Sequence, residues 1–302
     1  MSSRWRSIID NSAWSPSPLG GPEYAATMNM AWGKTYILET DRLFIPFVQS
    51  SVTNFGFLKS ECYQGLRFNS LPGCEKIDGE LLSALPQKCS LQLDIPEELY
   101  KSSQDILRQN HFSEQGNYLY YKVHLPSSYD EWFTQKGMDR SNIRKADKAG
   151  IEVEIGGMEM LEDFYKMFLC SFERWQKEDR AKDPHTIERF RRMFEIPSSC
   201  TKIACARYEG RVVSAVIFCH YKNTAGAFNS GTDFEYQKLR ASDYTFSEII
   251  RYLIGQGVGE LHLGGTLGGK NLSQFKRKLG ATEYVSHILT RHRFPRLRKL
   301  LK

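Results

Sequence analysis

The sequence has no long apolar stretch, and its opening residues do not look like a secretory leader. No apolar run in the 302 residues approaches the roughly 18 residues that a membrane-spanning helix requires. The mean hydropathy is −0.47. The opening segment, MSSRWRSIID, lacks the apolar region of a secretory signal peptide. We therefore expect a cytoplasmic protein with no transmembrane segment.

Sequence signatures of metal sites, hydrolases and nucleotidases are also missing. The seven cysteines include no CxxC pair, which argues against a structural zinc site and favours reduced thiols. The histidines form no HExxH motif, and there is no GxSxG elbow. The segment GGTLGGKN (264–271) resembles a P-loop but lacks the hydroxyl residue after its lysine. We expect no bound metal and no P-loop chemistry.

The composition is that of a globular protein with a small excess of positive charge. Lys and Arg number 41 and Asp and Glu number 35, so the net charge is +6, and 41% of residues are hydrophobic. A chain of this length predicts two domains or one large one. The basic residues gather in 140–148, 270–278 and the tail 291–302. This charge suits a phosphate-bearing ligand without requiring one.

Strand-like and helix-like segments alternate along the whole chain. A break at Leu125-Pro126-Ser127-Ser128 divides the chain into an N-terminal domain, 1–126, and a C-terminal domain, 127–302. The first half is expected to contain strands 36–39, 42–48 and 117–125 and helices 79–86 and 95–109. The second half is expected to contain helices 128–149, 159–179, 185–195, 241–255 and 271–278 and strands 151–155, 201–208, 212–221, 224–230, 259–263 and 282–291.

Three segments could bind a ligand. Arg140, Arg144 and Lys148 are spaced i, i+4 and i+8, so one helix face could bind an anion, although an ordinary solvated face has the same pattern. The other candidates are two strand–loop–helix transitions. A helix start or a glycine pair at such a transition admits an anion or a ligand backbone, yet many ordinary capped helices look alike. Their candidate residues are Asn229, Ser230, Lys238, Arg240 and Ser242 in the first and Gly264 and Gly265 in the second.

Four blocks of the C-terminal half together resemble the Fem-type branch of the GNAT-fold N-acyltransferases, which includes aminoacyl-tRNA-dependent peptidyltransferases. The blocks are RSNIRKADKAGIEVEIG (140–156), DFYKMFLCSFERW (163–175), the segment 203–242, and LHLGGTLGGKNLSQFKRKLGA (261–281). The N-terminal half matches more loosely. The resemblance implies an α/β (α+β) fold with two tandem GNAT-like domains, each a mixed sheet flanked by helices.

The resemblance also implies the reaction. An amine acceptor would attack an activated acyl or aminoacyl carbonyl directly, with acyl-CoA or aminoacyl-tRNA as donor and no tightly bound cofactor. The family's Phe-Lys pair falls on Phe275 and Lys276, so Lys276 is expected to stabilise developing negative charge. Alternatively, Lys276 could be an ordinary surface lysine with no role in the reaction.

One departure from the GNAT pattern bears on the donor. Arg240 stands where coenzyme-A-binding members carry a glycine, and Ser242 where they carry Gly or Ala. Larger side chains there crowd the pyrophosphate path, which favours a tRNA partner. A second hypothesis remains open: a non-catalytic RNA- or nucleotide-binding module on a GNAT scaffold. The sequence does not identify the acceptor or the oligomeric state.

Overall fold

In the computed structural model, the chain divides into two compact units. The first comprises Met1–Tyr120 and Tyr284–Lys302, and the second Tyr121–Glu283. The structure describes residues 4–7, 35–39, 43–55, 58–65, 69–70, 76–85, 89–135, 140–177, 185–195, 200–221, 223–266 and 269–293. Residues 294–302 of the C-terminal tail and residues 136–139 of the expected helix 128–149 lie outside these residues. The sequence-based boundary at 126 differs from this division mainly at the last strand, because that strand pairs with a strand of the first unit from Ser286 to Arg291.

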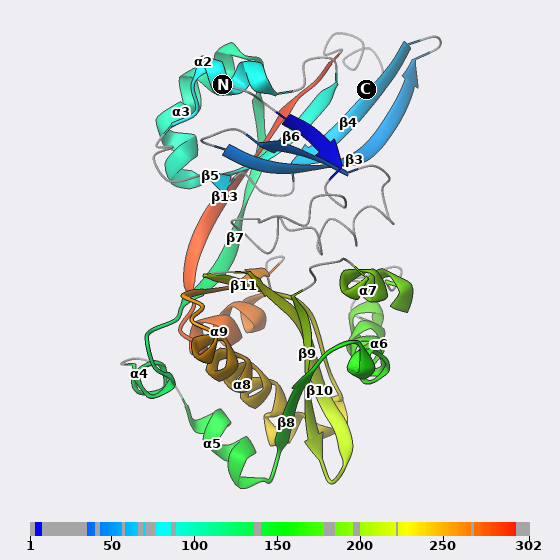
Figure 1. Ribbon diagram of the computed structural model, residues 1–302, viewed down its shortest axis with the longest axis vertical. Coiled ribbons are helices and arrows are strands. Elements are labelled where there is room, and N and C mark those ends of the chain that lie inside the picture. Colours follow the sequence, from blue (N-terminus) through cyan, green and yellow to red (C-terminus); the bar gives the residue numbers. More distant parts are fainter. Residues whose placement is uncertain are drawn as a thin grey trace. The chain divides into compact units, whose positions relative to one another are not determined.

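Among its described residues, the first unit is a mixed sheet with helices α2 and α3 on it (Figure 1). Its strand order is β1-β2-β3-β4-β6-β13-β7, with β5 paired to β3. Buried leucines of α2 and α3 pack on β6 and form its core. The elements are β1 (Arg4–Ser7), β2 (Thr35–Glu39), β3 (Leu43–Phe55), β4 (Leu58–Gly65), β5 (Asn69–Ser70), α2 (Gly79–Ala84), β6 (Ser90–Pro96), α3 (Glu97–Gln109), β7 (Ser113–His124) and β13 (Thr282–Arg291).

The second unit is also a sheet, in the order β8-β9-β10-β11-β12 followed by the end of β7. Helices α6 and α7 cover one face, whereas α5 and α8 cover the other (Figure 1). The elements are α4 (Tyr129–Thr134), α5 (Ser141–Lys148), β8 (Glu152–Gly156), η2 (Met158–Met160), α6 (Leu161–Lys177), α7 (Ile187–Phe194), β9 (Thr201–Tyr208), β10 (Arg211–Tyr221), β11 (Thr224–Thr232), η3 (Phe234–Leu239), α8 (Ala241–Gly255), β12 (Glu260–Gly265) and α9 (Lys270–Lys278).

The periodicity of α6 explains why it packs where it does. Leu161, Phe164, Phe168 and Phe172 recur at helical spacing and are all buried against the sheet. On the opposite face, α8 buries Ile249, Ile250 and Leu253. The sheet therefore lies between two apolar layers, one formed by α6 and the other by α8.

The fold class expected from the sequence is confirmed, but three local predictions are wrong. The expected helix 128–149 is divided into α4 and α5, because α4 ends where the backbone of Gln135 leaves the helical region. Arg140 does not share the exposed face of Arg144; it precedes α5, is 4% exposed and stacks on Trp132 at 4.3 Å. The strand β6 was not expected and displaces the start of α3 to Glu97.

Candidate active site

Strands β11 and β12 begin side by side and then separate. They pair in parallel only from Thr224 opposite Glu260 to Gly226 opposite His262. Beyond Gly226, the remaining residues of β11 as far as Thr232 pair with β10 alone in the described chain. The edge of β11 facing away from β10 is thus left without a strand partner. In a gap of this kind, backbone N–H and C=O groups find partners other than a neighbouring strand, such as side chains or a ligand.

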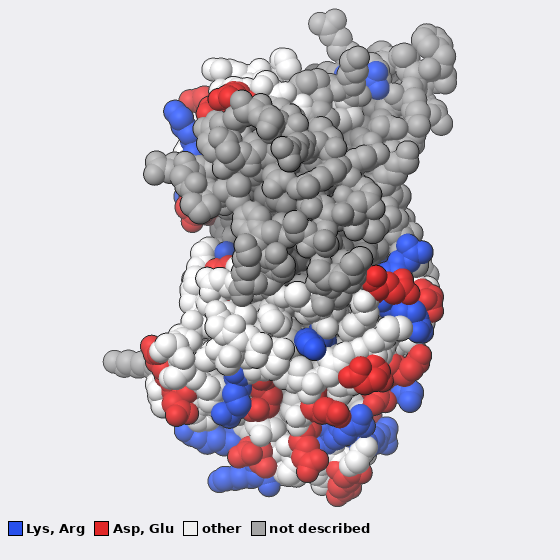
Figure 2. All heavy atoms as spheres, in the orientation of Figure 1, with Lys and Arg blue, Asp and Glu red and all other residues white. Residues whose placement is uncertain are grey.

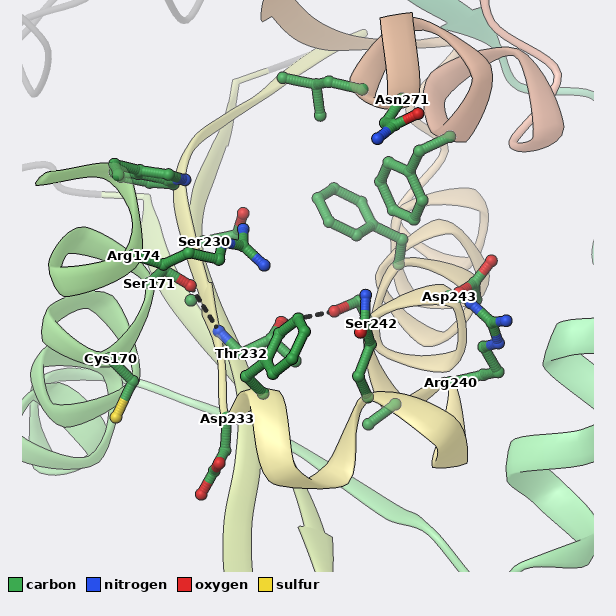
Figure 3. Close-up of a pocket in the computed structure, with 18 of the residues that line it drawn as sticks. Cys170, Ser171, Arg174, Ser230, Thr232, Asp233, Arg240, Ser242, Asp243 and Asn271 are labelled. Carbon is green, nitrogen blue, oxygen red and sulfur yellow. Dashed lines mark hydrogen bonds between the residues drawn. The ribbon is translucent and has the colours of Figure 1, made fainter. Parts of the chain in front are cut away.

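A pocket of about 1150 Å³ lies where β11 ends. Its wall comes from six parts of the second unit: α5, α6, the end of β11, η3, the start of α8, and α9. Figure 3 shows most of the lining residues. The residues that matter below are Cys170, Ser171, Arg174, Trp175, Ser230, Gly231, Thr232, Asp233, Phe234, Arg240, Ser242, Asp243, Phe246, Asn271, Leu272 and Phe275. The pocket combines aromatic rings with a few hydroxyl and charged groups, as small-molecule sites usually do.

A glycine allows α6 to reach the floor of this pocket. A Cβ atom at Gly231 would overlap the backbone of Met167 in α6. One residue further on, the backbone N–H of Thr232 donates to Ser171 Oγ at 3.0 Å. The close contact and the hydrogen bond together hold α6 against the last residues of β11.

Hydroxyl groups connect the end of β11 to the start of α8. Thr232 Oγ1 and Ser242 Oγ lie 2.5 Å apart, and buried Ser214 Oγ is 3.4 Å from each. Ser242 lies in the first turn of α8, where backbone N–H groups have no partner within the helix. The pocket floor is therefore polar.

The residue before α8 has a strained backbone. Arg240 has φ 63° and ψ 28°, the left-handed region that glycine adopts freely and other residues rarely adopt. This is the position where the sequence resemblance expects a glycine. Within the first turn, Asn142 Nδ2 donates to Asp243 Oδ1 at 3.0 Å, and burial raises the pKa of Asp243. The start of α8 thus carries its own acidic group.

The charged side chains labelled in Figure 3 do not all point into the cavity. Arg174 extends from α6 into the cavity, whereas Asp233, Arg240 and Asp243 turn away from it. Asp233 accepts from Arg211 at 2.9 Å and from the backbone N–H of Glu235 at 3.1 Å. The one labelled charge that enters the cavity is therefore positive.

Lys276 lies at the end of β12 and outside the pocket lining. Its Nζ donates to the carbonyl oxygens of Leu263, Gly264 and Gly265 at 2.6, 2.9 and 2.7 Å. The side chain is 5% exposed, and burial lowers its pKa to about 8. Its three donors hold the turn at Gly264, where φ is 66°. These contacts give Lys276 a structural role. Its expected role in stabilising negative charge on the reacting carbonyl stays a prediction.

The candidate residues from the sequence occupy three separate places. Those that line the pocket are Ser230, Arg240, Ser242 and Phe275, and Phe275 packs edge-on against Phe246 at 5.4 Å. Those at the end of β12 are Gly264, Gly265 and Lys276. Those outside the pocket lining are Arg144, Asn229 and Lys238. Arg144 and Lys238 are exposed, and the Arg144 guanidinium lies 5.3 Å from the Phe133 ring.

Sequence reasoning missed Ser171 and Arg174. They lie three residues apart on α6, beside the apolar stripe formed by Phe168, Phe172 and Trp175. Positions i and i+3 share a helix face, so the spacing shows that Ser171 and Arg174 point the same way. It does not show that the end of β11 lies opposite them.

A second titratable cluster involves His262, which the sequence left as a core or pocket-wall residue. His262 is 3% exposed, and its Nε2 lies 2.5 Å from Glu260 Oε1. Lys122 Nζ donates to the same carboxylate at 3.0 Å. Burial alone would raise the pKa of Glu260, but the His262 and Lys122 contacts lower it to about 2. This cluster is a buried ion pair and does not line the pocket.

Comparison with known proteins agrees with this geometry. Residues 135–284, which contain the whole pocket lining, match the acetyltransferase (GNAT) domain family. This part of the chain, which holds the pocket, is thus similar to a GNAT domain. Acyl transfer in general is therefore the activity that the findings support. A search of curated protein sequences finds no match to the chain.

Solved structures extend the likeness to nearly the whole chain. FemX is 12% identical with a TM-score of 0.69, covering 93% of each chain. L-PGS from Bacillus licheniformis is 12% identical with a TM-score of 0.52, covering 95% of this chain and 97% of its own. A tandem GNAT protein from the clavulanic acid pathway is 9% identical with a TM-score of 0.51, covering 96% and 93%. At these identities the likeness concerns the fold, and it confirms the tandem GNAT-like architecture and the resemblance to the Fem-type branch.

Two searches of the described residues are negative. No helix among them is long and apolar enough to cross a membrane. No group of three or more His, Cys, Asp or Glu side chains among them is arranged to hold a metal ion.

Proposed function

We propose that the protein is an N-acyltransferase that moves an activated acyl or aminoacyl group onto an amine by direct aminolysis. The observation that carries this proposal is the pocket at the end of β11, within the segment that matches the GNAT family. A reacting carbonyl there would meet backbone N–H groups and the hydroxyls of Ser230 and Ser242. Such donors can stabilise the negative charge that develops on the carbonyl oxygen.

The side chains of the pocket favour direct attack over a covalent acyl-enzyme. Cys170 is the thiol that lines the pocket, and burial together with Asp233 raises its pKa. A thiol with a raised pKa is a poor nucleophile at neutral pH. In Figure 3 its sulfur also points away from the cavity. The incoming amine is therefore the nucleophile in this proposal.

The start of α8 favours a charged tRNA over acyl-CoA as donor. A pyrophosphate needs uncovered N–H groups and no competing negative charge at a helix start. Here Arg240 replaces glycine, and the Asp243 carboxylate lies in the first turn. An aminoacyl ester could bring its acyl group into the pocket without placing phosphates at this position. Both donors are made in the cytoplasm, which is the location we expect.

The surface charge favours an enzyme over a simple RNA-binding module. In the described part of the second unit, Lys and Arg alternate with Asp and Glu over the face seen in Figure 2. A module that binds RNA through its backbone usually has a continuous basic surface. An enzyme that contacts only the acyl-bearing end of a tRNA requires a smaller basic surface.

The proposal is tested by offering both donors. The full-length protein is incubated with a panel of amines and either radiolabelled acetyl-CoA or a mixture of labelled aminoacyl-tRNAs, and amide products are separated by mass. We expect product from aminoacyl-tRNA. Product from acetyl-CoA alone would support the acyltransferase and overturn the choice of donor. Salt-dependent RNA binding with no product from either donor would overturn the enzyme and favour the binding module.

A further inference from the structure

One side of the pocket is formed by two pairs of side chains, one from α8 and one from α9. Ser242 and Phe246 are four residues apart on α8. Leu272 and Phe275 are three residues apart on α9. All four residues line the pocket. Residues at these spacings share a helix face, with Cβ atoms about 5–6 Å apart. Each helix therefore contributes two successive side chains to the same cavity.

The three apolar members of these pairs form a continuous surface, which we call the apolar wall: Phe246, Phe275 and Leu272. Phe275 packs edge-on against Phe246, with the ring centres 5.4 Å apart. Phe246 is 6% exposed, Phe275 is half-buried and Leu272 is 37% exposed. The exposed fraction thus rises with each step away from Ser242. The apolar wall therefore runs outward from the hydroxyl groups of the pocket floor.

The charged residues of the pocket lining are distributed unevenly. Those around α6 and η3 have both signs: Glu173, Arg174, Lys177, Asp233 and Glu235. At the start of α8, Arg240 and Asp243 turn away from the cavity (Figure 3), and Asp243 accepts a hydrogen bond from Asn142 at 3.0 Å. Lys278, the last residue of α9, is exposed. The side formed by α8 and α9 therefore suits a neutral apolar group, because an ion would lose hydration against the two rings.

The position of Ser242 indicates which part of a substrate meets the apolar wall. In the proposed reaction, the Ser242 hydroxyl lies at the reacting carbonyl. The acyl chain is attached to that carbonyl, and Phe246 is the next residue on the same helix face. The acyl chain can therefore lie along the apolar wall, where burial of its apolar surface is favourable. An acetyl group has only a methyl and would leave most of this wall uncovered.

We propose that the transferred acyl group carries a large apolar part, a ring or a chain of about four or more carbons, which the apolar wall binds. The orientation of the acyl group rests on the proposed function, whereas the binding of an apolar group does not. A phenylalanyl or leucyl ester on tRNA and a longer-chain CoA thioester would each supply such a group. In the reaction, the amine nitrogen bonds to the acyl carbon as the ester or thioester bond breaks, and the amine proton passes to the leaving alcohol or thiol.

Binding is measured by titration calorimetry with two neutral probes, phenylacetamide and acetamide, which differ by one phenyl ring. In the unaltered protein we expect phenylacetamide to bind about 10- to 50-fold more tightly, because its ring is buried against the apolar wall. Leu272→Asp should remove most of this preference, since it places a charge beside the ring. Leu272→Met should retain the preference, because the wall stays apolar.

Met158→Asp is the matched control, because Met158 is a 42% exposed apolar residue of the same unit that does not line the pocket. It should leave the preference unchanged. Both aspartates replace exposed side chains, so urea titration should find both variants folded. Equal affinity for the two probes in the unaltered protein would overturn the inference. So would a preference that survives Leu272→Asp or is lost in Met158→Asp.

Initial rates of transfer separate this inference from the proposed function. Phenylalanyl-tRNA is compared with glycyl-tRNA, and phenylacetyl-CoA with acetyl-CoA. Within the pair that yields product, we expect the larger acyl group to react at least about 10-fold faster. If the probe preference depends on Leu272 but no donor yields product, the apolar site stands and the proposed function fails. If the smaller acyl group reacts as fast as the larger one, the function stands and the inference fails.

Discussion

The ends of β11 and β12 differ sharply, although the two strands start as parallel neighbours. At the end of β12, three carbonyl oxygens are bound by the Lys276 ammonium, and the side chain is almost completely buried. At the end of β11, a pocket opens and Arg174 enters it. The Lys276 side chain is thus enclosed at the end of its strand, whereas the Arg174 side chain extends into a cavity (Figure 3).

The difference shows that small residues at a strand end do not by themselves mark a ligand site. Gly231 is small because the backbone of α6 passes next to it. Gly264 is glycine because the chain turns with a positive φ before α9. Both look alike in the sequence, yet only the end of β11 lines the pocket. What packs against each strand end decides whether it can bind a substrate.

The largest expected effect is at the β11 end. Gly231→Ala places a Cβ against the backbone of Met167, which can be relieved only by moving α6. We expect the free energy of unfolding to fall by about 3 kcal/mol in a urea titration. Gly255→Ala at the end of α8 is the control, since no atom lies within 4 Å of that Cβ. Equal stability of the two variants would show that α6 does not approach β11 so closely.

Removing the Lys276 contacts at the end of β12 should lower the free energy of unfolding somewhat less. Lys276→Met removes the three hydrogen bonds and leaves the carbonyl oxygens of Leu263, Gly264 and Gly265 without that donor. We expect a loss of about 2 kcal/mol in the free energy of unfolding. Exposed Lys270→Met in the same helix should change it little. A stable Lys276→Met protein that has lost only its transfer activity would contradict the structural role and support the catalytic one.

The pH dependence of stability gives a second readout for Lys276. Burial lowers its pKa from 10.5 to about 8, so the unfolded chain binds more protons than the folded chain between these values. The free energy of unfolding should therefore rise with pH across that window, by on the order of 1–3 kcal/mol. Lys276→Met should lack this rise. Parallel curves for the two proteins would mean that the lysine titrates normally.

The smallest expected effect is at the start of α8. Arg240→Gly relieves a left-handed backbone conformation but adds flexibility to the unfolded chain. We expect a net gain of about 0.5 kcal/mol in thermal unfolding, and tighter binding of coenzyme A because the helix start is uncovered. Arg240→Ala shortens the side chain but keeps the strain, so it should show no gain in stability. Tight binding of coenzyme A by the unaltered protein would argue against the tRNA donor.

Much of the C-terminal half of the chain could be predicted from sequence patterns. The expected helix 241–255 and strand 282–291 match α8 and β13 in both bounds. Their apolar periodicity and the residues that end them are local signals. Strand β6 was missed, although Leu91, Leu93 and Ile95 alternate with less buried residues as a half-buried strand requires. Its short length before Pro96 and the helix that follows concealed the alternation.

The candidate site was harder to predict because its residues are brought together by packing. Ser230 and Ser242 were found because they follow a strand and begin a helix. Arg174 was not, because the sequence does not reveal that α6 crosses the end of β11. Lys276 was chosen by resemblance, and its position in the chain carries no sign that three carbonyl oxygens surround its ammonium.

The most direct test of the account is to obstruct the end of β11 without touching β12. Ser230→Trp places an indole at the pocket wall beside Arg174, and Thr282→Trp places one at an exposed position of β13 as a control. Initial rates of aminoacyl transfer are measured for both, with urea titration to establish that each is folded. The account predicts that Ser230→Trp loses at least about 100-fold in rate, whereas Thr282→Trp retains it. Full transfer activity in folded Ser230→Trp would contradict the account, because the reaction would then take place elsewhere.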